Sequence, residues 1–80
     1  MVAPTKFHFT AHARRRAEER GITQGLFIEV VTAHEKKKQQ YRGSHGGFGY
    51  LFTKRIADRE LHIAAEVHKD ECFFVTGFWT

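Results

Sequence analysis

The sequence predicts an α+β fold in which two N-terminal helices pack on one face of a mainly antiparallel sheet of three to five strands. Two observations support this prediction. Apolar side chains recur at helical spacing between residues 11 and 34. After residue 47 the chain consists of short segments rich in aromatic and β-branched residues, with turn residues between them. A strand, two helices and then hairpin-linked strands indicate helices and sheet in separate layers.

Length and composition indicate one soluble globular domain that spans residues 1–80. Hydrophobic residues make up 41% of the chain, and eight of the 80 residues are phenylalanine. No apolar run approaches the roughly 18 residues of a membrane span, and the N-terminus lacks a signal-peptide pattern. The single cysteine, Cys72, fits a reducing compartment. We therefore expect a cytoplasmic protein that does not bind membranes.

The first elements are a short edge strand and a helix. Residues 6–9 alternate polar and aromatic side chains, as edge strands do. Thr10 is a suitable N-cap for the Ala-, Arg- and Glu-rich run after it, and Gly21 is a suitable terminator. Ala13 and Ala17, one turn apart, form a narrow apolar ridge. This ridge predicts a helix that approaches the sheet closely.

A second helix is predicted from Thr23, its N-cap, to about His34. Ile22 and Phe27 have the spacing of a hydrophobic staple, which fixes the entry of the chain into a helix. The apolar residues of this segment fall on one stripe, as expected for a helix buried on one side. They are Leu26, Phe27, Val30, Val31 and Ala33.

The pattern then changes to that of a sheet. Residues 36–42 are polar with one aromatic side chain, which fits an edge strand or an extended connector. Residues 43–47 are mostly glycine and form a loop, but they lack the strand-before, helix-after context of a phosphate-binding loop. Residues 48–56 are aromatic and alternate poorly, as a central strand covered on both faces would.

The last two strands follow tight turns at residues 57–59 and 69–71. Residues 61–68 show the clearest alternation in the chain, and residues 72–79 form an apolar closing strand. If the apolar set of residues 61–68 faces the helices, the other set faces solvent or a ligand. That second set includes His62, Glu66 and His68.

Charge is distributed unevenly, which indicates a polyanion as partner. Residues 1–42 contain nine Lys or Arg and four Asp or Glu, a balance of +5, whereas residues 43–80 contain four and five, a balance of −1. Two basic clusters in one half favour nucleic acid. The alternative is a solvated helix face and a solvated strand edge. The candidate nucleic-acid-binding residues are Arg14, Arg15, Arg20, Lys36, Lys37, Lys38 and Arg42.

His12 and Arg16, one turn apart on the first helix, are candidates for acid–base chemistry. An imidazole both accepts and donates protons near neutral pH. Cleavage of RNA by its own 2′-hydroxyl requires a base, an acid and a cation at the phosphorane, without a metal. With Glu66 or His68 from the sheet, His12 and Arg16 supply these groups. The alternative is that His12 is a surface or capping histidine.

The remaining reactive side chains give no cofactor site. His62 and His68 face one way but lie about 20 Å apart along a strand, too far to share a metal ion. Cys72 follows acidic residues, which do not activate a thiol, and is assigned to packing. Tyr41 is assigned to packing, with base stacking as the alternative. His8, His34 and His45 are assigned structural or incidental roles.

The pattern resembles the bacterial family catalogued as domain of unknown function 4258. It consists of His12, Arg16 four residues later, and Arg20-Gly21-Ile22-Thr23 before the second helix. A preceding Phe9-Thr10 and a closing 74–79 strand complete it, so that the resemblance covers nearly the whole chain. The glycine-rich loop and the tripled arginine are not part of the family pattern.

The resemblance implies the fold of the barnase, EndoU, colicin and RelE ribonucleases, whose members recur as toxin domains. It carries His12, Arg16 and Thr76 over as family positions. A small toxin-type ribonuclease that acts without a metal or other cofactor is therefore the expected function. RNA is the expected partner, with a cognate antitoxin or immunity protein as a second one. The candidate catalytic residues are His12, Arg16, Glu66, His68 and Thr76.

Two other classes of function remain open. A non-catalytic RNA- or nucleic-acid-binding module needs only the basic charge and exposed aromatic side chains. A protein-interaction module needs an exposed apolar patch, and its basic face would meet an acidic partner.

Overall fold

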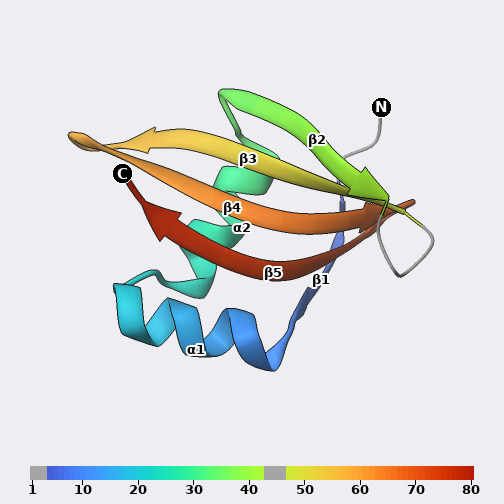
Figure 1. Cartoon of the computed structure of the whole chain (residues 1–80), viewed down its shortest axis with the longest axis horizontal. Helices are drawn as coiled ribbons and strands as arrows, with labels where there is room; N and C mark the ends of the chain where they lie inside the picture. The colour runs from blue at the N-terminus through green and yellow to red at the C-terminus, as the bar shows by residue number, and fades with distance from the viewer. Residues whose placement is uncertain (1–3, 43–46) are drawn as a thin grey trace.

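The computed structural model describes residues 4–42 and 47–80 (Figure 1). Five strands form one sheet with two helices packed against it. The elements in order are β1 (Lys6–Phe9), α1 (Ala11–Arg20), α2 (Gln24–Thr32), β2 (Lys36–Arg42), β3 (Phe48–Ile56), β4 (Arg59–His68) and β5 (Glu71–Trp79). The predicted α+β class and both helices are therefore confirmed. No helix in the described ranges is long and apolar enough to cross a membrane.

The sheet is mainly antiparallel, as predicted, but the parallel pairing of its first strand makes it mixed. The strand order is β1-β5-β4-β3-β2, and the four strands from β2 to β5 pair antiparallel with their sequence neighbours. Strand β1 lies parallel to β5 at the opposite edge. Hairpins follow from short turns, but the partner of β1 lies more than 60 residues away in the chain, and no local pattern specifies it.

Helix α1 has the predicted boundaries for the predicted reasons. The Thr10 hydroxyl accepts a hydrogen bond from the Ala13 amide at 3.1 Å. Gly21 ends the helix in the left-handed conformation, with φ of 65°. Ala13 and Ala17 are its buried residues, so the small ridge does face the sheet.

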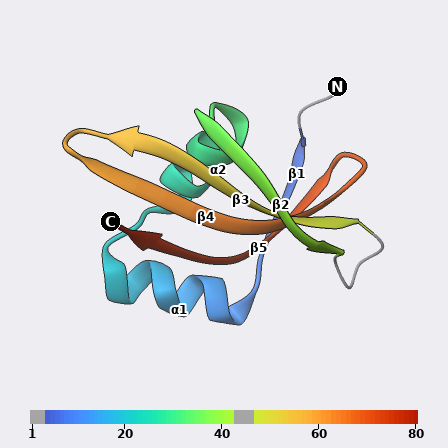
Figure 2. The ribbon, with the colours of Figure 1, turned by 45° about the horizontal axis from the view of Figure 1, so that its top comes forward.

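Helix α1 protects the outer edge of β5 where β1 no longer pairs with it. Strand β1 pairs with β5 only as far as Phe74. From there the Thr10 hydroxyl donates to the Phe74 carbonyl at 2.9 Å, and Arg20 Nη1 donates to the Gly77 carbonyl at 2.6 Å. The Trp79 indole donates back to the Arg20 carbonyl at 2.8 Å. Figures 1 and 2 both show α1 running alongside β5.

Helix α2 lies across strands β3 and β4 (Figure 2). It supplies Phe27 and Val30, two of the largest fully buried side chains. Phe27 is fully buried and packs edge-on against Phe74 of β5, with ring centroids 5.2 Å apart. The helix ends at Thr32, two residues before the predicted end at His34. The core comprises Ala13, Ala17, Ile22, Phe27, Val30, Val31, Phe52, Leu61, Ile63, Ala65, Cys72 and Phe74.

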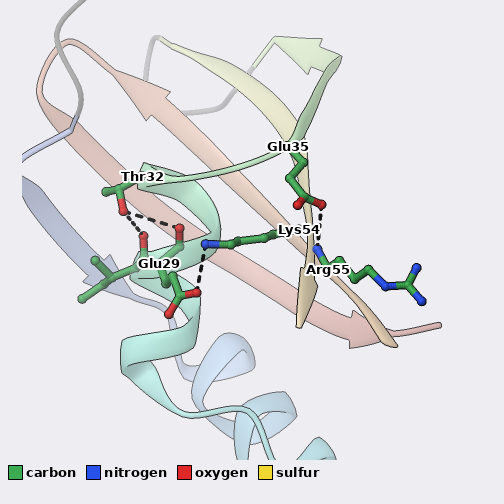
Figure 3. Close-up of polar contacts among 6 residues, drawn as sticks. Glu29, Thr32, Glu35, Lys54 and Arg55 are labelled. Carbon is green, nitrogen blue, oxygen red and sulfur yellow. Dashed lines mark hydrogen bonds and ion pairs between the residues drawn. The ribbon is translucent and has the colours of Figure 1, made fainter. Parts of the chain in front are cut away.

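Polar contacts tie the C-terminal end of α2 to β3 (Figure 3). The Lys54 ammonium lies 3.0 Å from the Glu29 carboxylate, and the Thr32 hydroxyl donates to carbonyls of the preceding helical turn. After the helix, the Glu35 carboxylate accepts from the Arg55 backbone amide at 2.9 Å. These contacts hold the connection between α2 and β2 against the C-terminal end of β3.

The remaining strand predictions hold in part. Residues 36–42 form an edge strand with every residue exposed, as one of the two alternatives predicted. Strand β3 lies inside the sheet, and helices cover only one of its faces. Thr53 and Gly49 on its other face are nevertheless buried, so the predicted burial on both faces holds in part. Both turns lie as predicted, at Ala57–Asp58 and Lys69–Asp70. Of the predicted 43–47 loop, only Gly47 belongs to the described residues, and His45 lies outside them.

Candidate functional site

The sheet face opposite the helices collects three of the predicted catalytic residues. Strand β4 buries one set of alternate side chains beneath α2, whereas Glu66 and His68 belong to the other set. Thr76 of β5 pairs with Ala64, which also belongs to that second set. Directly paired residues share a face, so Glu66, His68 and Thr76 all lie on what we call the uncovered face. Glu66 lies between the other two, about 7 Å along the strand from His68.

One row of the uncovered face crosses all five strands. Its members, from edge to edge, are His8, Phe73, Glu66, Gly49 and Tyr41. The Tyr41 ring lies over Gly49, where an added Cβ would come within 2.4 Å of it. Glu66 is only 9% exposed, although no helix covers this face. Burial and the charge of Glu66 raise the pKa of Tyr41.

A second row contains a histidine held on several sides. The His62 ring stacks on Phe78 with centroids 4.8 Å apart. Its Nδ1 lies 2.9 Å from the Thr53 hydroxyl, and its Nε2 lies 2.8 Å from the Thr80 hydroxyl. Lys36 of β2 completes the row beside Thr53. Because both ring nitrogens are engaged, His62 is suited to fixing the orientation of Phe78.

The histidine of β1 is held in a similar way. The His8 ring stacks on Phe73 with centroids 4.6 Å apart, and its Nε2 lies 3.1 Å from the Glu71 carboxylate. Glu71 in turn pairs across the ladder with His68. The uncovered face therefore carries two phenylalanine rings, Phe73 and Phe78, and each of them stacks on a histidine ring of the neighbouring strand.

Basic residues of β2 border this face on one side. Lys36 and Lys38 pair with Thr53 and Leu51, which share the face with Glu66. Lys37 alternates to the other side of the sheet, where its ammonium lies 4.3 Å from the Tyr50 ring centre. The predicted lysine cluster is thus divided between the two faces.

Basic residues of α1 border the face on the other side. Arg14 lines a groove of about 510 Å³ between the two helices. Arg20 instead lines a groove with Phe78, a residue of the uncovered face. His12 and Arg16 lie two turns and one turn before Arg20, and so on the same flank of the helix. The sequence-predicted pair therefore lies along the border of the uncovered face.

His12 and Arg16 stand apart from the sheet groups with which the sequence grouped them. Arg16 pairs with Glu19 of its own helix, Nη1 to Oε1 at 2.7 Å. The exposed His12 imidazole has no hydrogen bond or ion pair with any residue in 4–42 or 47–80. Glu66, His68 and Thr76 lie on the uncovered face itself, whereas His12 and Arg16 lie along its border.

Several residues of this face are not predicted from the sequence to be functional. The sequence pattern assigns Tyr41 to packing and His8 to a structural or incidental role, and it gives no role to Thr53. The alternation of His8 with Phe7 and Phe9 is the sequence feature that could have placed His8 on the face opposite the two phenylalanines. The row that joins Tyr41 to Glu66 depends on a register shift between Gln39 and Tyr41, which the sequence does not reveal.

Comparison with known proteins identifies a family for this chain. The family model described as domain of unknown function DUF4258 matches residues 9–79. The chain belongs to this family. The match spans α1, α2 and every strand from β2 to β5. No curated protein and no solved structure matches the chain.

Proposed function

We propose that this DUF4258 protein is a small metal-independent endoribonuclease that binds RNA across the uncovered face. The observation that carries the proposal is the position of Glu66, a nearly buried carboxylate in the middle of a face with basic residues along two borders. A carboxylate at this position is suited to accept a proton from an RNA hydroxyl, while the borders bind the flanking phosphates.

The reaction that we assign to the uncovered face is cleavage of an RNA phosphodiester by attack of the neighbouring 2′-hydroxyl. Glu66 accepts the hydroxyl proton as the 2′-oxygen attacks the adjacent phosphorus. His68, about 7 Å along the strand, donates a proton to the departing 5′-oxygen. Both groups then lie within hydrogen-bond reach of a phosphate between them. Thr76 donates to a phosphate oxygen, and Arg16 attracts the strand from the border.

Access to Glu66 requires movement of Tyr41. The ring lies across Gly49, beside Glu66, and is 43% exposed. It belongs to an edge strand that only β3 pairs with, so rotation of the side chain disturbs little packing. RNA binding would place a base where the tyrosine ring now lies.

A non-catalytic RNA-binding module is the second candidate function. The two rings Phe73 and Phe78, each stacked on an imidazole, favour it, because aromatic platforms bind single-stranded bases without chemistry. This function requires nothing of Glu66. Substitution of that residue therefore separates the two candidates.

The first test is an RNA cleavage assay with the parent and Glu66→Gln, which removes the base but keeps its shape. We expect the variant to cleave about 10²–10⁴-fold more slowly, as removal of a positioned acid or base does. Glu18→Gln on α1 is the matched control and should cleave at the parental rate. Equal rates for Glu66→Gln and the parent would exclude Glu66 as the base. RNA binding without cleavage by the parent would favour the binding module.

Variants of α1 test whether His12 and Arg16, on the border of the uncovered face, contribute to RNA binding or to the chemical step. Because Arg16 lies on the border, Arg16→Lys should raise KM more than it lowers kcat: it keeps the charge but loses the two-donor geometry. His12→Ala should behave in the same way and melt within about 1 kcal/mol of the parent, since the side chain is exposed. A selective loss of kcat in His12→Ala would instead place that imidazole in the chemistry.

A further inference from the structure

A second concave site lies where the C-terminal end of α1 meets the end of β5. This groove of about 450 Å³ is within the size range of small-ligand sites. Its lining comes from three elements, α1, β4 and β5. The residues are Glu19, Arg20, Arg59, Phe78 and Trp79.

Two guanidinium groups from distant parts of the chain meet there. Arg20 is anchored by its Nη1, which donates to the Gly77 carbonyl at 2.6 Å. Arg59 is anchored differently, with its guanidinium carbon 4.9 Å from the Trp79 ring centre. A guanidinium has five donor hydrogens, so each anchored arginine keeps donors for a ligand. Preorganised arginines lose little side-chain freedom when they bind an anion.

The carboxylate of Glu19, the one acid that residues 4–42 and 47–80 contribute to the lining, is already paired with a cation. Glu19 Oε1 lies 2.7 Å from Arg16 Nη1, an ion pair on the exposed side of α1. The groove therefore has an excess of positive charge beside two aromatic rings. An oxyanion with a flat apolar group attached to it matches this arrangement.

We propose that this groove binds a nucleotide, with its phosphate on Arg20 and Arg59 and its base or sugar against Phe78 and Trp79. The identification of the ligand as part of an RNA strand rests on the proposed function. Phe78 belongs both to this groove and to the second row of the uncovered face. A strand bound across that face would therefore continue into the groove, which makes it a subsite away from the cleaved bond.

The test uses the fluorescence of Trp79, the single tryptophan of the chain, during titration with adenosine 5′-monophosphate. We expect saturable quenching by the nucleotide, weaker binding of inorganic phosphate and weakest binding of adenosine. Arg59→Gln should raise the Kd at least about tenfold, because charge-assisted hydrogen bonds to phosphate are lost. Arg55→Gln, which removes an exposed arginine of β3 outside the groove lining, should leave the Kd unchanged.

A second variant protects the test against indirect effects of Arg59 on the indole. Glu19→Gln removes a carboxylate from the lining and should tighten nucleotide binding several-fold. Equal affinities for all variants, or tighter binding of adenosine than of its phosphate, would overturn the proposal.

The result of the nucleotide titration can be interpreted whether or not the protein cleaves RNA. Nucleotide binding that responds to Arg59 and Glu19 in a protein without RNA cleavage would support this groove and contradict the ribonuclease. Cleavage that depends on Glu66, with no nucleotide bound here, would do the reverse.

Discussion

Cys72 shows how one buried side chain links the core to pH. It is fully buried at the start of β5, and burial raises the pKa of its thiol from 9.0 to about 12. The sequence assigned it to packing, and its burial agrees with that assignment. A thiol with a raised pKa in the folded state is a poor nucleophile at neutral pH.

The raised pKa of Cys72 predicts loss of stability in alkali. Between pH 9 and about 12 the unfolded thiol loses its proton while the folded thiol keeps it, so unfolding becomes more favourable. The free energy of unfolding should fall by up to about 1.4 kcal/mol per pH unit in this range, and Cys72 should contribute no slope below it. Urea denaturation of the parent and Cys72→Ala between pH 8 and 11 measures the difference. Equal slopes for both proteins would contradict the assignment.

The residues of the uncovered face were predictable only where local alternation decides their direction. The period of two in residues 61–68 correctly placed His62, Glu66 and His68 on the side away from the helices. Tyr41 depends on a register shift in β2 and on a glycine in the next strand. Such pairing across strands leaves no trace in either segment alone.

Among the elements, α1 has a role beyond its own hydrogen bonds. Its cap residue, Thr10, accepts from the Ala13 amide and donates to the Phe74 carbonyl on the outer edge of β5. One hydroxyl thus begins the helix and attaches it to the sheet. Thr23, the cap of α2, accepts from the Leu26 amide in the same way, with no bond to the sheet among the described residues.

These two caps give a matched prediction. Thr23→Ala should lower the free energy of unfolding by about 1 kcal/mol, the usual cost of a lost N-cap. Thr10→Ala should cost about 1 kcal/mol more, because a part-buried carbonyl also loses its donor. Thermal or urea unfolding of both variants measures the difference. If the two losses were equal, the bond to Phe74 would contribute nothing to stability.

Helix α1 and the start of α2 were predictable because their start and stop signals are local. Thr10, Gly21 and Thr23 act where the sequence placed them. The placement of α1 along the edge of β5 was not predictable, because it follows from β1 pairing with β5 for only four residues. The candidate site depends on that placement, since it brings the flank of His12 and Arg16 to the border of the uncovered face.

At the scale of the whole molecule, the basic half of the sequence is divided between two edges of one face. The α1 border and the β2 border lie on opposite sides of the sheet, with β5, β4 and β3 between them (Figure 1). The sequence showed the excess charge but not this division. The uncovered face carries the rings of Phe73 and Phe78 and the Glu66 carboxylate between two basic borders. This arrangement favours an extended polyanion over a compact ligand.

This arrangement predicts a directional effect of the lysine cluster on RNA binding. Lys36 and Lys38 point to the uncovered face, and Lys37 points to the opposite one. The double substitution of Lys36 and Lys38 by Gln should reduce the slope of log K against log salt by about 1.4, or 0.7 per lost phosphate contact on single-stranded RNA. The pair Lys37→Gln and Arg14→Gln removes the same net charge from positions directed elsewhere and should leave the slope near the parental value. Fluorescence anisotropy with a short labelled RNA at several salt concentrations measures the slopes. Equal reductions in both doubles would mean that RNA responds to net charge alone, and the uncovered face would lose its claim to be the binding surface.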